Sequence, residues 1–364
     1  MKHTQRWMFM GAAALVFAAC DKHDGGNNGN NGNSKHVYTI NNSVKGNFLM
    51  EYRRASNGQL TLDTVYDAGG VGTGSGLGSQ GAVIIADDGT VLAVNAGSNT
   101  ISSFRRSSHG LSLVSTVGSG GTMPISITSW NSTVFVLNAA GGGNFSGFNL
   151  SATGKLSAMA GSTHALSSNA SGPAEIAFVN NGSALVVTEK ATNKITSYTS
   201  SGAHSLVSAN ATPFGFAVGR NGNIYVSEAA GGGANASTVS SYHIDYNGAI
   251  KLVTGPVAAS QTAACWVVLT DNNKYAYVSN TGSNNMSSLN VNGNSGVISV
   301  NKANAAGTGS KPTDAVLSSG SEFLYVITPA SNTINCYRVG EDGGLTSIQT
   351  INGIAGSAVG LAAN

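Results

Sequence analysis

A unit of about 40 to 50 residues recurs seven times along the chain, and this repetition limits the possible fold more than any other feature. Each unit reads as an apolar strand, a turn of the N-G or D-G type, a second strand such as "LYV", a polar loop, a third strand such as "TISSF", a glycine turn and a fourth strand. Such a unit is one blade of a β-propeller, because its strands bury their faces only against neighbouring units. The residues that end the second strands are Asn42, Asn95, Asn138, Glu189, Glu228, Asn280 and Thr328. The sequence therefore predicts an all-β, seven-bladed propeller of four-stranded antiparallel blades.

The first unit lacks its opening strand, because "HVYTIN" at 36–41 already corresponds to the second strand of the other units. The missing strand is expected at the end of the chain. There "GSAVGLAAN" (356–364) has the spacing of "GTMPISITS" and "GSKPTDAVL", which open other units. We expect residues 359–363 to form the innermost strand of blade one and so to close the ring.

The N-terminal residues do not belong to the repeats. Lys2 and Arg6 precede an apolar run and then small residues, an order typical of a signal peptide, here residues 1–19. "VFAAC" resembles a bacterial lipobox, in which the cysteine, here Cys20, carries the lipid; an ordinary cleaved signal is the alternative. Residues 20–35 are rich in Gly and Asn and are expected to be a flexible tether, which leaves 36–364 as one propeller domain. We expect a lipoprotein of the cell envelope, periplasmic or on the outer surface.

Composition excludes several classes of function. A net charge of +2, with 9% charged residues and scattered basic side chains, is too small for nucleic-acid binding. The run "GVGTGSGLG" follows no βαβ pattern, and GxSxG, HExxH and CxxC motifs are absent from the sequence. We predict a monomer with no cofactor and no metal, although a ring of Asn and Glu oxygens could hold Ca²⁺. Cys265 and Cys336 lie in different repeats and are not expected to pair.

Two rings of residues are candidates for a site on one face of the propeller. The first lies two positions after each blade-opening proline, in the expected channel wall, where Glu175, Trp266 and Asp314 stand out as ligand-binding residues. The second consists of the strand-ending residues, in which asparagine suits a tight polar turn. Glutamate is too long for that turn, so Glu189 and Glu228 are the candidate catalytic carboxylates.

In this hypothesis one carboxylate acts as general base on a water, and Lys190 or an asparagine amide holds the developing oxyanion. Asn138 and Asn280 complete the expected substrate-binding set. The alternatives are structural: a surface ion pair between Glu189 and Lys190, packing for Trp266, and hydrogen bonds to backbone amides for Glu175 and Asp314.

The phrases "LVVTEKATNKI", "PFGFAV", "YVSEAAGGG", "TAACWVVLT" and "AYVSNTGS" resemble the lactonase-type propellers. That family contains 6-phosphogluconolactonase and carboxymuconate lactonising enzyme (carboxymuconate cyclase), and it grades into YVTN-repeat surface proteins. The resemblance implies a hydrolase of a lactone. The family's characterised members place histidine and arginine around the channel, whereas here these residue types fall on outer strands and turns, which argues against a phosphorylated substrate. An uncharged lactone or sugar-derived ester is expected, and the alternative is a non-catalytic surface propeller that binds glycan or protein.

Overall fold

The computed structural model describes residues 35–364, which form a single compact unit. The predicted signal peptide (1–19), Cys20 and the tether up to residue 34 lie outside the described residues. Within residues 35–364, no helix is long and apolar enough to cross a membrane.

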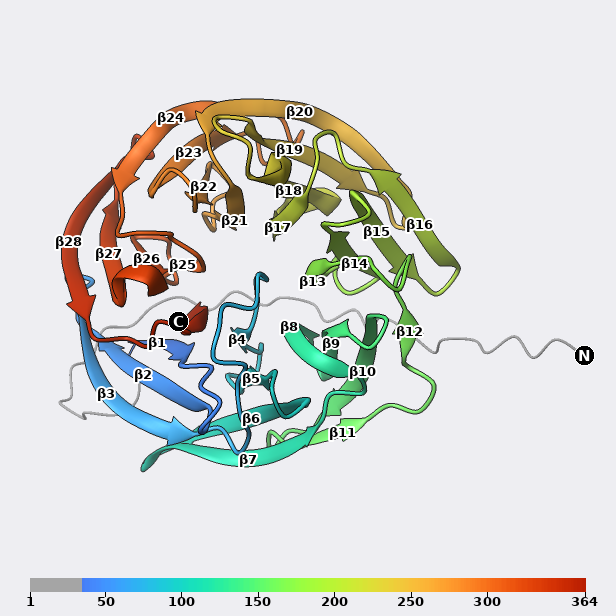
Figure 1. Ribbon diagram of the computed structural model, residues 1–364, viewed down its shortest axis with the longest axis vertical. Coiled ribbons are helices and arrows are strands. Elements are labelled where there is room, and N and C mark those ends of the chain that lie inside the picture. The colour runs from blue at the N-terminus through green and yellow to red at the C-terminus, as the bar shows by residue number, and fades with distance from the viewer. Residues whose placement is uncertain (1–34) are drawn as a thin grey trace, which may run out of the picture. The chain divides into compact units, whose positions relative to one another are not determined.

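Seven antiparallel sheets stand around a central axis, as predicted (Figure 1). From the channel outward, blade one consists of β29 (Val359–Ala363), β1 (Lys35–Ile40), β2 (Phe48–Arg54) and β3 (Leu60–Asp67). Blade two consists of β4 (Val83–Ile85), β5 (Val91–Asn95), β6 (Thr100–Ser107) and β7 (Gly110–Gly118). Blade three consists of β8 (Thr122–Trp130), β9 (Thr133–Ala140), β10 (Asn144–Leu150) and β11 (Leu156–Ala158), with β12 (His164–Ala165) as a further partner of β10.

The remaining blades repeat the same order. Blade four consists of β13 (Pro173–Val179), β14 (Ala184–Glu189), β15 (Lys194–Thr199) and β16 (Gly202–Val207). Blade five consists of β17 (Pro213–Val218), β18 (Asn223–Glu228), β19 (Ser237–Ile244) and β20 (Ile250–Gln261). Blade six consists of β21 (Ala264–Leu269), β22 (Tyr275–Asn280), β23 (Asn285–Val291) and β24 (Ile298–Gly307). Blade seven consists of β25 (Ala315–Leu317), β26 (Phe323–Thr328), β27 (Thr333–Val339) and β28 (Leu345–Asn352).

The ring closes through its two ends, as the sequence predicts. β29 pairs antiparallel with β1, with Val37 opposite Ala363 and Tyr38 opposite Ala362. The Thr39 hydroxyl also donates to the Val359 carbonyl at 3.2 Å. Because the last strand of the chain completes the first blade, the two ends of the described chain cannot separate without opening a blade.

Burial follows the position of a strand within its blade. The second strands β14, β18, β22 and β26 are buried along their whole length, because strands flank them on both edges and neighbouring blades cover both faces. The outermost strand β3 buries one of its eight residues. Cys265 and Cys336 are buried free thiols, as expected from their places in different repeats.

Candidate functional site

The strand-ending residues hold the loops between blades in place. Asn95 shows the pattern: its side-chain amide donates to the Ala68 carbonyl (3.3 Å), which follows β3 of the preceding blade, and to the Ser102 hydroxyl (2.8 Å). Asn138 likewise donates to the Ser119 carbonyl (3.2 Å) and to Asn144 (2.7 Å). The amide of Asn280 donates to Asn285 and Ser287, each at 2.8 Å.

Glu228 serves the same purpose with a carboxylate. It is fully buried, and its oxygens accept five hydrogen bonds, from Ser208 Oγ (2.7 Å), Asn210 N (3.2 Å), Tyr242 OH (2.9 Å), Thr238 Oγ1 (2.6 Å) and Ser240 Oγ (2.8 Å). Two of these donors precede β17 and three lie on β19. A carboxylate surrounded in this way has no lone pair facing open space, so the geometry assigns Glu228 a structural role.

Glu189 is also fully buried, and it accepts from the backbone and hydroxyl of Ser167 and from Thr192 Oγ1 (2.7 Å). The alternative of a surface ion pair with Lys190 is therefore wrong. Lys190 Nζ instead donates to the carbonyls of Gly78 (2.5 Å) and Pro173 (3.0 Å) and lies 4.6 Å from the centre of the Phe214 ring. With its donors used in this way, Lys190 is not placed to hold an oxyanion in this conformation.

Trp266 packs within the fold and does not line an open mouth. Its side chain is 5% exposed, its ring centre lies 5.0 Å from that of Phe214, and its Nε1 donates to the Ser79 carbonyl at 2.8 Å. The ring-stacking role predicted for it is not available here, because a loop from another blade covers it.

That loop, residues 72–81, precedes β4 and is called the crossing loop below. It reaches toward the middle of the ring (Figure 1). The side chain of Gln80 bonds to blade six: its amide nitrogen donates to the Val267 carbonyl (2.9 Å), and its amide oxygen accepts from the Val267 N–H (3.1 Å). The backbone N–H of Gln80 donates to the Ala174 carbonyl (3.1 Å), and Ser79 Oγ to the Ile125 carbonyl (2.9 Å). The Gln80 amide also donates to the Phe216 carbonyl of blade five at 3.3 Å. The crossing loop thus bonds to blades three to six and covers the channel on this face.

A cavity of about 350 Å³ occupies the channel below the crossing loop. Its lining includes Gln80, Glu175 and Asp314, which lie near the start of innermost strands, and Asp87 and Ser129, which lie near the end of such strands. Side chains of the first group are mostly buried, whereas Asp87 is exposed and Ser129 is half-buried. The channel is therefore closed by the crossing loop and opens on the opposite face, where the turns between first and second strands lie.

Glu175 and Asp314 face this cavity from blades four and seven. Glu175 accepts the Phe216 N–H at 2.6 Å, and Asp314 accepts the Gly360 N–H at 2.9 Å, so each carboxyl bonds to the innermost strand of the next blade. Ser126 makes the equivalent contact, accepting the Ile176 N–H at 3.2 Å. The structural alternative predicted for the two acids is thus confirmed as one part of their role.

The carboxyls differ from Ser126 in having a second oxygen. The described residues make no hydrogen bond to Oε1 of Glu175 or to Oδ1 of Asp314. Burial raises the pKa of Glu175 well above its usual range, and the nearby Asp314 charge raises it further. Burial also raises the pKa of Asp314 to about 7. The two raised pKa values favour the protonated forms of both carboxyls, and Asp314 can exchange its proton near neutral pH, as acid–base catalysis requires.

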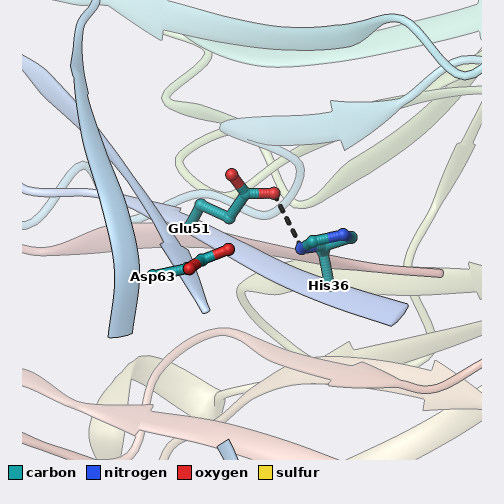
Figure 2. Close-up of side chains that lie close together, drawn as sticks. All are labelled: His36, Glu51 and Asp63. Atoms are coloured by element: carbon teal, nitrogen blue, oxygen red, sulfur yellow. Dashed lines mark ion pairs between the residues drawn. The ribbon is translucent and has the colours of Figure 1, made fainter. Parts of the chain in front are cut away.

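A further cluster of ionisable groups lies in blade one, away from the channel lining. His36, Glu51 and Asp63 approach one another closely enough to suggest a metal site, and Figure 2 shows Glu51 paired with His36, whose Nδ1 lies 2.7 Å from Oε1. Glu51 is already bound by the guanidinium of Arg106 and by the hydroxyl of Tyr66 (2.9 Å).

Asp63 in turn pairs with Arg53 at 2.5 Å. Burial, with the neighbouring guanidinium of Arg106, lowers the pKa of His36 to about 4. These contacts link blades one and two, and both oxygens of Glu51 and one oxygen of Asp63 are bound by protein donors.

Reasoning from the sequence alone missed Gln80. It stands where other blades open with proline, as at Pro124, Pro173, Pro213 and Pro312, and that substitution was the available signal. A long amide in place of proline can form hydrogen bonds across the channel that proline cannot.

Comparison with known proteins agrees with this geometry. Residues 230–359 match the family described as "Lactonase, 7-bladed beta-propeller". Among curated proteins, none matches the chain by sequence. Several solved structures share the fold at low identity.

One is a "putative 6-phosphogluconolactonase" of Bacteroides fragilis, 18% identical, covering 91% of this chain and 98% of its own, with a TM-score of 0.71. A second protein described in the same words, from Bacteroides uniformis, is 20% identical, with coverage of 91% and 99% and a TM-score of 0.71. The periplasmic gluconolactonase of Pseudomonas aeruginosa is 15% identical, again with coverage of 91% and 99% and a TM-score of 0.71. Residues 230–359 thus resemble the lactonase family of seven-bladed β-propellers by sequence, and the whole ring shares its fold with these solved structures.

Proposed function

We propose that the protein is a lactonase-type hydrolase that opens a neutral lactone or sugar-derived ester in the channel cavity. The observation that carries this proposal is the pair Glu175 and Asp314, two acids with raised pKa values that face one cavity, each with one oxygen not bonded to the protein. Perturbed acids in a recess are a recurring feature of catalytic sites.

The lining of the cavity supports an uncharged substrate. Its residues include no lysine, arginine or histidine, so nothing in it would neutralise a phosphate or carboxylate. Most of the other lining side chains are aliphatic, with a few hydroxyls such as Thr128 and Ser129. A volume of about 350 Å³ lies within the range of small-molecule sites.

In the proposed reaction Glu175 is the acid and Asp314 is the base. Asp314 takes a proton from a water as the water oxygen bonds to the lactone carbonyl carbon, and the hydrogen bond from Glu175 stabilises the oxyanion that forms. The ring C–O bond then breaks, and the proton of Glu175 passes to the leaving alkoxide. The product is the hydroxy acid. Before the water attacks, ionised Asp314 disfavours loss of the Glu175 proton, because like charges repel. After the reaction the proton on Asp314 returns to Glu175 through solvent, which restores the starting pair.

The experiment is hydrolysis of neutral and acidic lactones by the purified protein, with Glu175→Gln and Asp314→Asn beside it. We expect turnover of neutral lactones only, reduced at least a hundredfold in each variant. Asp87→Asn is the matched control, because Asp87 is an exposed carboxyl at the open end of the cavity and takes no part in the reaction. Absence of turnover together with glycan or protein binding would support the alternative, a non-catalytic surface propeller.

The proposed location is the cell envelope, with a lipid on Cys20 holding the propeller at a membrane. Support comes only from the order of basic, apolar and small residues before Cys20. At that location the protein would meet extracytoplasmic lactones and sugar esters, which fits the preference for an uncharged substrate.

A further inference from the structure

The crossing loop meets blades four and six through a row of its own oxygens. The Gly78 carbonyl accepts from Lys190 Nζ at 2.5 Å, and the Ser79 carbonyl from Trp266 Nε1 at 2.8 Å. The side-chain oxygen of Gln80 accepts from Val267 N at 3.1 Å. Three donors of different kinds, fixed on two blades, thus converge on three consecutive oxygen-bearing residues of one loop.

These donors border an apolar recess. Phe214 and Trp266 are in ring contact, and Ala174, Ala229 and Cys265 pack against them, all buried. Hydrogen-bond donors in such surroundings bind an oxygen acceptor strongly, because water competes poorly there and an unpaired donor is costly. The recess therefore requires an acceptor, and the crossing loop supplies it.

The composition of the crossing loop would allow this segment to leave the recess. Five of its ten residues are glycine, and residues 74–76 are exposed. Gly78, which lies over Lys190 and Phe214, has a φ of +59°, a conformation that glycine adopts without cost. Leu77 is the loop's one large apolar side chain, and it is only partly buried. Hydrogen bonds, more than apolar packing, hold the loop in place.

We propose that the crossing loop is an internal ligand, and that the recess it fills is a second binding site for a neutral ring compound bearing a carbonyl group. When the loop lifts, Lys190 Nζ and Trp266 Nε1 are free to donate to the carbonyl oxygen of the ligand, which has two lone pairs. Water takes the Val267 N–H, and the Phe214 and Trp266 rings contact the apolar part of the ligand. This inference does not depend on the acid–base roles of Glu175 and Asp314. Lys190 and Trp266, predicted from the sequence as ligand-contacting residues, take such roles in this second site.

The test uses Trp266 as its own reporter. The sequence contains three tryptophans, so the full-chain variant Trp7→Phe/Trp130→Phe keeps only Trp266. In this background acrylamide should quench the emission weakly, because Trp266 is 5% exposed. Adding Gln80→Ala removes the loop's bonds to Val267 and should raise the quenching constant at least threefold. If the Gln80→Ala variant folds and its acrylamide quenching constant is unchanged, the proposal is wrong.

Ligand binding is then probed with δ-valerolactam, a neutral six-membered ring whose amide resists hydrolysis, and with tetrahydropyran, a similar ring without a carbonyl. In the Gln80→Ala variant, δ-valerolactam should restore protection from acrylamide and tetrahydropyran should not. Lys190→Met, which keeps an unbranched stem over Phe214, should weaken the effect of δ-valerolactam at least fivefold. Equal effects of the two rings, or no effect of either, would show that the recess is not a carbonyl site.

Should Gln80→Ala fail to fold, hydrogen exchange of the wild-type chain replaces it. Amides of residues 72–81 should exchange at least a hundredfold faster than those of β13 and β14, and δ-valerolactam should accelerate that exchange by holding the loop open. Protection equal to that of the two strands would mean that the loop is a fixed part of the fold.

Discussion

Glu175 and Phe216 lie on the innermost strands of adjacent blades, and the carboxyl of the first accepts the backbone N–H of the second at 2.6 Å. The innermost strand of a blade has one edge without a strand partner, so the backbone N–H groups on that edge need other acceptors. A side chain from the preceding blade supplies one. The acid that we propose for catalysis is therefore also part of the ring's construction.

This dual role separates two substitutions of Glu175. Glu175→Gln keeps an oxygen acceptor for the Phe216 N–H, so the free energy of unfolding should change by less than about 1 kcal/mol. Glu175→Ala leaves that buried donor unpaired and should lower the unfolding free energy by about 1–3 kcal/mol. Urea titrations of both variants measure the difference. Equal destabilisation by Gln and Ala would indicate that the Phe216 contact contributes nothing.

The pKa of Asp314 predicts how stability depends on pH. Burial raises it to about 7, whereas an aspartate in the unfolded chain titrates near pH 4. Between these values the folded state binds more protons than the unfolded state, so stability falls as pH rises from about 4 to about 7 and then levels off. The raised pKa of Glu175 acts in the same direction.

Asp314→Asn keeps an acceptor for Gly360 but cannot ionise. The unfolding free energy of this variant should therefore decrease much less between pH 4 and pH 8 than that of the wild type. The two decreases should differ by on the order of 4 kcal/mol. Chemical denaturation across this range measures the two curves. Parallel curves would mean that Asp314 is ionised at little cost in the folded state.

Glu228 should behave as a structural residue. Glu228→Ala leaves five buried donors without their acceptor and should lower the unfolding free energy by about 3 kcal/mol or more. Glu228→Gln should cost about 1 kcal/mol, because the hydroxyls of Ser240 and its neighbours can turn to accept from the new amide. Lactone turnover per folded molecule should be unchanged in Glu228→Gln. A tenfold loss there would restore the catalytic role first predicted from the sequence.

The sequence predicted the architecture because a blade is a local unit. Four short strands and their turns recur within each repeat, and the incomplete first repeat required a strand from the C-terminus, which β29 supplies. The channel position of Glu175 and Asp314 followed from the same register. The periodic pattern is sufficient for such predictions because each strand's place depends on its nearest neighbours.

The roles of Glu189 and Glu228 could not be predicted in the same way. Asparagine and glutamate occupy equivalent places, and what differs is the set of donors that the folded loops bring to them. For Glu228 a signal existed: Thr238, Ser240 and Tyr242 alternate along β19 and so place three hydroxyls on one face. The path of the crossing loop had no comparable signal, because a glycine-rich segment is compatible with many conformations.

The proposed lipid anchor on Cys20 gives a prediction outside the described residues. Cells fed a clickable palmitate analogue should label the wild-type protein, and Cys20→Ala should remain unlabelled, because the thiol is the expected attachment point. Cys336→Ala is the matched control and should be labelled like the wild type, since Cys336 is buried in the folded propeller. Labelling of Cys20→Ala would show that the cysteine is incidental to the signal sequence.

Removal of residues 356–364 should open the ring. The deletion takes away β29, so β1 becomes an exposed edge and Asp314 loses the Gly360 N–H that satisfies its carboxyl. Val359 and Leu361, both largely buried, also leave the core, at roughly 1.5–3 kcal/mol for each apolar side chain. The thermal midpoint should fall by well over ~5 °C.

Removal of Asn364 alone is the control: it breaks the bond from the His36 N–H to the Asn364 side chain but leaves β29 intact, and should shift the midpoint far less. If the longer deletion melts like the control, closure by β29 does not stabilise the propeller.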